Sequence, residues 1–314
     1  MKDYNMTTTR KFSTRLSRRV FLGAMGASVG FSGLPFNLRA APKSPGRAIA
    51  FDSDALILAD STLSRNDGDW SPLPVPTPGD ILSLATHPGR PGRILAGLTS
   101  GGVALSEDGG YGWEAKSKGL PDAPATAVTV AAAEPDTFYA AILGDGLWKS
   151  DDAGQSWALA MDRPWLAKAE RDLTALASVD LATGMGGIWI YAGTELGLTR
   201  VPDCFCRWQE VQPGDAMDAL VSGEPAPMEA PLPGGETIKA LVSAPSLPTR
   251  LFAALPSGIW HSQDAGVRWS QKLNTRALGV AVHPNNAHFV VAITGDGLVE
   301  SRNGGTNWTA LARV

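Results

Sequence analysis

Short apolar runs alternate with polar turns from about residue 47 to the end of the chain. In each unit a first apolar run is followed by a second, then by a glycine turn and a third run. The first runs are 81–84, 127–130, 173–176, 238–241 and 278–282, and the second runs are 94–97, 138–141, 189–192, 251–254 and 289–292. Such short runs, rich in β-branched and aromatic residues and bounded by Gly, Pro and Asn, predict strands. Their continuous apolar character predicts burial on both faces, as in stacked sheets.

A polar turn closes each unit and ends in tryptophan. The pattern Ser-x-Asp/Asn-x-Gly-x-x-Trp occurs at 106–113, 150–157, 262–269 and 301–308, with a shortened copy at 64–70 and a decayed one at 201–208. The six tryptophans fall at 70, 113, 157, 208, 269 and 308, so they lie 39 to 61 residues apart. A unit of about 40 residues is the length of a four-stranded propeller blade.

The residues of this turn have a local structural explanation. Asp and Ser side chains accept hydrogen bonds from backbone N–H groups in a tight loop, and Gly supplies positive φ. The tryptophan buries a large ring between layers while its N–H finds a carbonyl. We therefore assign a structural role to Asp108, Trp113, Asp152, Trp157, Asp264, Trp269, Asn303 and Trp308.

The repeated turn resembles the Asp-box of the BNR repeat families, which include sialidases, xyloglucan-type glycoside hydrolases, sortilin-like receptors and the photosystem II assembly-factor group. The resemblance covers residues 47 to 314 through six imperfect copies. It implies an all-β fold, a β-propeller of six four-stranded blades over residues 41–314. We expect the ring to close by packing of the first blade against the last. These families share an architecture and differ in function, so the repeat indicates the fold more strongly than the activity.

The first forty residues predict an export signal. Residues 17–22 read Ser-Arg-Arg-Val-Phe-Leu, a twin-arginine motif, and an uncharged run from Val20 to Leu34 follows. That run is shorter than the about 20 residues that a membrane span needs, and Arg39-Ala40-Ala41 offers a cleavage site. Residues 1–40 are therefore interpreted as a twin-arginine signal peptide. The mature protein is expected in the periplasm or otherwise outside the cytoplasm.

Removal of the signal makes the chain strongly acidic. Residues 1–40 hold seven of the 27 basic residues and one of the 31 acidic ones, so 20 basic and 30 acidic residues remain, a net charge of −10. Such a surface gains nothing from counterion release and argues against nucleic acid or anionic lipid as a partner. No second long hydrophobic stretch follows, so no membrane span is expected after cleavage. We expect a monomer.

Four acidic residues occupy turns between second and third runs, namely Asp60, Asp145, Glu195 and Asp296. They could form a ring at the propeller mouth that binds a cation or a basic peptide, or that supplies the paired carboxylates of a glycoside hydrolase. They could equally be turn residues, since Gly-Asp-Gly is favourable turn chemistry. A sialidase is disfavoured because Tyr111, Tyr139 and Tyr191 are not placed as nucleophiles. No catalytic residue is assigned.

Cys204 and Cys206 are the only cysteines, and both lie in the decayed turn. In an oxidising compartment they could form a small disulfide that replaces the lost turn bonds. Free thiols and a metal or redox role are the alternatives. The four histidines show no ligand spacing, so neither a metal nor a cofactor is expected.

Two insertions lengthen the links between units. Residues 162–172 contain Trp165 and predict a short helix after Pro164, and residues 212–236 are rich in Pro, Ala and acid. Both links should lie on the same face as the acidic turns, and long loops on a rigid scaffold are where binding tends to occur. The candidate binding residues are therefore Asp60, Asp145, Trp165, Glu195 and Asp296.

Together these features favour an exported, non-catalytic propeller that binds a protein as an assembly or scaffold factor, for instance for a periplasmic redox complex. This interpretation follows the resemblance to the photosystem II assembly-factor and sortilin-like groups. The alternative is a carbohydrate-active glycoside hydrolase that uses the acidic residues at the mouth.

The export signal gives a direct test. The combined substitutions Arg18→Lys and Arg19→Lys keep the charge but remove the guanidinium pair that the twin-arginine route recognises. We expect the uncleaved precursor to accumulate in the cytoplasm, measured by fractionation and immunoblotting. Normal export of the double variant would show that another route carries the protein.

Overall fold

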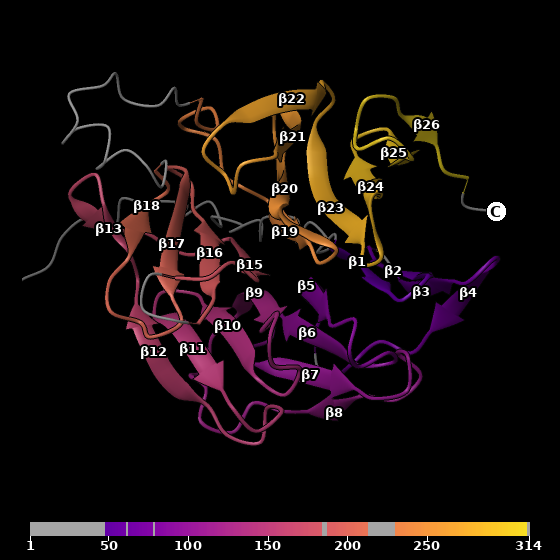
Figure 1. Cartoon of the computed structure of the whole chain (residues 1–314). Helices are drawn as coiled ribbons and strands as arrows, with labels where there is room; N and C mark the ends of the chain where they lie inside the picture. Colours follow the sequence, from indigo (N-terminus) through magenta and orange to yellow (C-terminus); the bar gives the residue numbers. More distant parts are fainter. Residues whose placement is uncertain (1–47, 61, 78, 184–186, 213–229, 313–314) are drawn as a thin grey trace, which may run out of the picture. The chain divides into compact units, whose positions relative to one another are not determined.

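The structure is a computed structural model that describes residues 48–60, 62–77, 79–183, 187–212 and 230–312. Within these ranges the regular secondary structure consists of strands (Figure 1). They form six four-stranded antiparallel sheets, arranged as a six-bladed β-propeller, and one short hairpin. The prediction of an all-β, six-bladed propeller is confirmed. The signal peptide predicted at 1–40 lies outside the described residues.

Each sheet is a meander in which consecutive strands pair from the innermost to the outermost. The first sheet contains β1 (Ala48–Asp52), β2 (Ala55–Ala59), β3 (Leu63–Asn66) and β4 (Trp70–Leu73). The second contains β5 (Ile81–Thr86), β6 (Ile94–Leu98), β7 (Val103–Ser106) and β8 (Glu114–Ala115). The third contains β9 (Ala125–Val130), β10 (Phe138–Ile142), β11 (Gly146–Ser150) and β12 (Ala158–Asp162).

The other three sheets follow the same order. The fourth contains β15 (Ala175–Val179), β16 (Trp189–Gly193), β17 (Leu198–Pro202) and β18 (Gln209–Glu210). The fifth contains β19 (Ala240–Ala244), β20 (Leu247–Leu255), β21 (Gly258–Ser262) and β22 (Trp269–Leu273). The sixth contains β23 (Ala277–His283), β24 (Asn286–Thr294), β25 (Gly297–Ser301) and β26 (Thr309–Ala310).

This up-and-down topology gives the propeller two faces. The turns between second and third strands and the links between sheets lie on one face, which we call the loop face. The turns between first and second strands and between third and fourth strands lie on the other, which we call the repeat-turn face. Hydrogen bonds join the two kinds of turn on the repeat-turn face, for example from Ala153 N to Asp136 O at 2.9 Å and from Gly109 N to Gly92 O at 2.8 Å.

The apolar cores lie between neighbouring sheets. The buried side chains described form six clusters, one for each pair of neighbours, including the pair formed by the first and sixth sheets. The second strands are the most deeply buried, with Ile57, Ile94, Tyr191 and Leu251 fully or almost fully enclosed. Burial on both faces explains why these runs are apolar at every position rather than at alternate ones.

The sixth sheet meets the first by packing, with all four strands of each sheet drawn from one continuous segment. Phe51 of β1 packs edge-on against His283 and Phe289, with ring centroids 5.2 Å apart in both cases. His283 Nε2 lies 2.9 Å from Asp54 Oδ1 across the same boundary. The expected closure by packing of the first sheet against the last is what the described residues show.

The repeated turns have one hydrogen-bond pattern in four sheets. The hydroxyl of the leading serine donates to the side-chain oxygen of the Asp or Asn two residues later. The same hydroxyl oxygen accepts a hydrogen bond from the N–H of the glycine four residues later. That Asp or Asn oxygen accepts the backbone N–H four residues further on. The twelve donor–acceptor distances range from 2.7 to 2.9 Å around Ser106, Ser150, Ser262 and Ser301.

The tryptophans that follow these turns connect neighbouring sheets. Trp70 and Trp269 are the first residues of β4 and β22, and the other four directly precede the outermost strands of their sheets. Five of the six indole N–H groups donate to a backbone carbonyl of the preceding sheet or of the segment that leaves it, at 2.6 to 3.2 Å. These bonds are Trp113 to Pro74, Trp157 to Lys116, Trp208 to Asp162, Trp308 to Lys272 and Trp70 to Ala312.

The buried serine of the turn gives a stability prediction. Ser262→Ala removes the acceptor of the buried Gly266 N–H, which lies 2.9 Å from the serine oxygen. An unpaired buried N–H costs about 1–3 kcal/mol, and we expect the unfolding free energy to fall by that amount in urea denaturation.

The matched control is Ser270→Ala in the same sheet. Ser270 is exposed, and its hydroxyl lies 3.5 Å from His261 O. Surface substitutions of this kind usually change stability by less than about 0.5 kcal/mol. Equal losses in both variants would show that the turn bond does not stabilise the sheet.

Candidate functional site

The four acidic residues singled out from the sequence lie on the loop face, on four different sheets. Asp60, Asp145, Glu195 and Asp296 occupy the β2–β3, β10–β11, β16–β17 and β24–β25 turns. Asp145, Glu195 and Asp296 are exposed, and Asp60 is half-buried. The structure therefore distributes these carboxylates around the face, one to a turn.

Two of these carboxylates have specific side-chain partners. Asp145 Oδ2 accepts the indole N–H of Trp148 at 2.5 Å. Glu195 Oε1 lies 2.8 Å from Arg171 Nη1, an ion pair that links the β16–β17 turn to the insertion after β12. These two carboxylates contribute to local structure, which is the turn role weighed in the sequence analysis.

The first insertion forms a β-hairpin, so the helix predicted after Pro164 is wrong. Its strands are β13 (Trp165–Leu166) and β14 (Ala169–Glu170), paired antiparallel. Ala167 and Lys168 form the turn with φ of 46° and 69°. Two successive residues with positive φ are the backbone of the two-residue hairpin turn that matches strand twist.

Charged groups fix the base of the hairpin to two neighbouring sheets. Arg163 pairs with Glu170 across the hairpin and with Asp172 at 3.2 Å. Asp172 Oδ1 also accepts the N–H of Gly144 in the β10–β11 turn at 2.9 Å. With the Arg171–Glu195 pair, these contacts hold the hairpin between the loop-face turns of the third and fourth sheets.

Exposed apolar side chains gather on these elements. Trp165 is 69% exposed at the start of β13, Leu143 in the β10–β11 turn is 44% exposed, and Leu196 in the β16–β17 turn is 38% exposed. We call these three residues the loop-face apolar cluster. The sequence pattern marked Trp165 but not the two leucines, although Leu196 directly follows Glu195 and Leu143 lies two residues before Asp145.

The second insertion is described only from residue 230 onward, and 213–229 lie outside the described residues. Ala230 bonds to Val267 and Trp269 through backbone groups, beside the start of the outermost strand β22. Glu236 reaches the loop face, where its Oε2 accepts the N–H of Ser257 at 2.7 Å. The expectation that this link lies on the loop face therefore fits Glu236 but is wrong for Ala230.

The propeller axis is hollow, and its larger cavity opens toward the repeat-turn face. A volume of about 240 Å³ is lined by the ends of all six innermost strands and by the turns that follow them. A smaller volume of about 60 Å³ lies toward the loop face. Neither lining includes any of the four acidic turn residues. Sequence reasoning missed the larger cavity because inner-strand ends carry no distinctive motif.

Polar groups at the larger cavity form hydrogen bonds mainly between neighbouring sheets. Thr86 Oγ1 donates to Phe51 O at 2.6 Å, and the N–H of Ala132 donates to Ser178 Oγ at 2.8 Å. His87 accepts the N–H of Gly89 on Nδ1, so its Nε2 carries the proton donated to Ala132 O at 3.0 Å. These hydrogen bonds link neighbouring innermost strands around the cavity.

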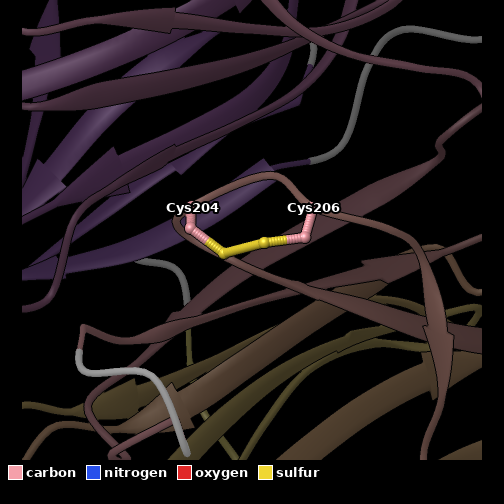
Figure 2. The surroundings of a disulfide bond; sticks show 2 residues. All are labelled: Cys204 and Cys206. Carbon is pink, nitrogen blue, oxygen red and sulfur yellow. A yellow bond between two sulfur atoms is a disulfide. The ribbon is translucent and has the colours of Figure 1, made fainter.

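The structure joins Cys204 and Cys206 as a disulfide in the β17–β18 turn (Figure 2). This turn occupies the place of the repeated turn in the fourth sheet. Both cysteines are exposed, on the repeat-turn face.

The titratable groups with shifted pKa values lie in the turns and the core. Hydrogen bonds from Ser156, then Ser150, lower the pKa of Asp152 to about 2. Hydrogen bonds from Gly112 and Ser106 lower the pKa of Asp108. Burial raises the pKa of Tyr139 and Tyr191. Among the described residues no group of three or more His, Cys, Asp or Glu side chains could hold a metal ion, and no helix has the length and apolarity of a membrane span.

Comparison with known proteins identifies the architecture. Neither a family model nor a curated protein matches the chain. A GH74 xyloglucanase from Xanthomonas campestris is similar over 83% of this chain and 45% of its own, with a TM-score of 0.51 and 19% identity. A GH74 enzyme from Niastella koreensis gives a TM-score of 0.55 at 18% identity, over 85% of this chain and 45% of its own. YCF48 from Cyanidioschyzon merolae gives a TM-score of 0.50 at 13% identity, over 81% of this chain and 80% of its own.

These likenesses show a shared β-propeller fold. The chain spans less than half the length of the two GH74 enzymes. The identities are too low to transfer a site or an activity, because propellers of one architecture carry unrelated functions.

A buried histidine gives a pH-dependent prediction. His261 is 3% exposed and stacks on Phe252, with ring centroids 4.7 Å apart. Burial, followed by the charges of Arg250, Lys272 and His288, lowers its pKa to about 4. The folded protein keeps this imidazole neutral, whereas the unfolded chain takes up a proton below about pH 6.5. Stability should therefore be full above pH 6.5 and should fall by about 3 kcal/mol between pH 6.5 and 4.

The measurement is the unfolding free energy in urea across this pH range. His261→Phe should remove most of the decline between pH 6.5 and 4. His288→Gln, at an exposed position, removes only the smallest of the named contributions and should retain most of the decline. The same decline in His261→Phe would assign the pH dependence to other groups.

Proposed function

We propose that this chain is an exported, non-catalytic propeller that binds another protein through its loop face, as an assembly or scaffold factor. The observation that carries the proposal is the rigid hairpin that presents Trp165 to solvent. A tryptophan so exposed is costly for a free surface and is among the commonest anchors of protein interfaces.

The contacts at the hairpin base make it a prepared binding element. Arg163, Arg171 and Asp172 tie it to turns of two sheets, so little conformational freedom remains to be lost when a partner binds. Elements that are already ordered bind with a smaller entropic cost than flexible loops. Leu143 and Leu196, on the turns that hold the hairpin, extend the apolar contact area.

Charge indicates the kind of partner. Glu170 and Glu195 are paired with Arg163 and Arg171, so the negative charge offered to a partner comes from Asp145 in the β10–β11 turn and from the net charge of −10 of residues 41–314. The proposed partner therefore offers an apolar or aromatic side chain flanked by Lys or Arg. Complementary charge of this kind mainly speeds association and selects the partner.

The extent of the likeness to known propellers also fits a scaffold role. Its likeness to YCF48 extends over 80% of that protein, whereas a GH74 enzyme is more than twice as long as the part matched. The glycoside hydrolase alternative has weaker support, because the four acidic residues lie on separate turns and outside the two cavities. The twin-arginine motif at 17–22 supports export.

The test compares two exposed aromatic residues on opposite faces. A photo-crosslinking amino acid is placed at Trp165 or at Tyr111, which is 58% exposed in a repeated turn, and the adducts are identified by mass spectrometry from periplasm. We expect a defined protein adduct at 165 and none at 111.

Trp165→Ala should then weaken binding of that purified protein by at least about 30-fold, a typical loss at an interface anchor. Tyr111→Ala should leave binding unchanged, and both variants should keep the thermal stability of the parent. Equal binding by Trp165→Ala and the parent would overturn the proposal.

A further inference from the structure

The disulfide of the fourth sheet lies where the other sheets use hydrogen bonds alone. In the aligned turn of the third sheet, Ala153 and Gly154 take positive φ between Asp152 and Trp157. In the fourth sheet Cys204 and Phe205 fill these two positions, and Phe205 has a φ of 53°. A bulky residue in the left-handed region must be stabilised by its surroundings. For Phe205, contacts of its aromatic ring provide this stabilisation.

The ring of Phe205 attaches the turn to the neighbouring third sheet. It packs against Tyr139 of the third sheet, with ring centroids 5.9 Å apart, and Lys149 Nζ lies 6.0 Å from its centroid. The two cysteines on either side of it are exposed. The ring of the middle residue of the Cys-x-Cys segment thus contacts the third sheet, while the cysteine residues on either side are exposed.

Other bonds hold the turn without the sulfur–sulfur link. The N–H of Asp203 donates to Ile188 O at 3.0 Å, and the N–H of Phe205 donates to Pro202 O at 2.8 Å. The indole N–H of Trp208 donates to Asp162 O at 2.7 Å, and β17 still pairs with β18. The backbone that brings the two sulfurs together therefore does not depend on the bond between them.

The stabilising effect of this disulfide is expected to be small. The cysteines are two residues apart, and the chain entropy removed by a crosslink grows with the length of the loop that it closes. This disulfide joins two exposed residues, adds little stability and lies in a turn that other bonds hold. These are properties of an exchangeable disulfide rather than of a structural one.

We propose that Cys204 and Cys206 form a thiol–disulfide exchange site whose substrate is a dithiol on another protein. A thiolate of the substrate attacks one sulfur, the intramolecular bond breaks, and a mixed disulfide forms while the other cysteine leaves as a thiolate. The second substrate thiol, as its thiolate, then attacks the mixed disulfide. The products are an oxidised substrate disulfide and reduced Cys204 and Cys206, so two electrons and two protons pass to this protein.

Charged neighbours on the turn set the conditions for this exchange. Arg207 follows Cys206 directly and is exposed, and Lys149 reaches the ring of Phe205 while pairing with Asp151 at 2.8 Å. Positive charge favours the thiolate that leaves or attacks. Asp203 precedes Cys204, and its negative charge disfavours the thiolate. The site lies on the repeat-turn face, so it goes beyond the protein-binding function proposed for the loop face.

The experiment uses the mature folded protein and a peptide dithiol as probe. The protein is mixed with an equimolar reduced Cys-x-x-Cys peptide without denaturant, the thiols are trapped by alkylation, and both partners are analysed by mass spectrometry. We expect the peptide to gain a disulfide while Cys204 and Cys206 become alkylated in equal amount. Cys206→Ser, activated as a mixed disulfide at Cys204, should pass that group to the peptide thiol.

Two controls separate exchange from a structural role. The double variant Cys204→Ser and Cys206→Ser should not oxidise the peptide, and its melting temperature should lie within about 2 °C of the parent, as should that of the reduced parent. Trp165→Ala should exchange normally, so failure here is distinguishable from failure of the loop-face proposal. A disulfide that is reduced only in denaturant, or whose reduction lowers the melting temperature by about 10 °C or more, would overturn the proposal.

Discussion

Apolar packing between neighbouring sheets is the constraint on which this propeller depends, and at five of the six boundaries a tryptophan indole adds a hydrogen bond to the preceding sheet or to the segment that leaves it. A four-stranded sheet with both faces apolar cannot bury them alone, so each sheet needs a neighbour on either side. Apolar contact is not directional and would tolerate sliding. The indole N–H fixes the distance and the register of the outer strands, as with Trp157 on Lys116 and Trp308 on Lys272.

The repeated turn positions the tryptophan that follows it, although Trp269 bonds to Gly266 O within its own turn. Ser150 and Asp152 satisfy the backbone N–H groups of the turn, which places Trp157 at the start of the outermost strand. In the fourth sheet the turn has lost its serine, yet Trp208 still reaches Asp162. The ring of Phe205 and backbone bonds hold that turn in place, which leaves its two sulfurs available for chemistry.

The sequence predicted the repeating architecture well, because periodic tryptophans and continuously apolar runs have direct physical causes. It failed at one local element, the first insertion, and at features that depend on partners distant in the chain. Pro164 suggested a helix, but Arg163 with Glu170 and the positive φ of Ala167 and Lys168 favour a hairpin. The cavity at the repeat-turn face was also missed, since it arises from the six strand ends together. The sequence did mark Trp165, and only the fold shows that the turns carrying Leu143 and Leu196 are bonded to the base of its hairpin.

The contacts that close the ring have a consequence for the order of events during synthesis. Trp70 bonds to Ala312, 242 residues away, and Asp54 bonds to His283, 229 residues away. The face of the first sheet that packs on the sixth sheet therefore stays uncovered until almost the whole chain has left the ribosome. Long-range contacts of this kind form late, because the entropy of closing the intervening loop must be overcome first. Phe51 and the apolar residues around it are therefore exposed to contact with other chains during most of translation. This exposure ends when the sixth sheet forms and packs on them.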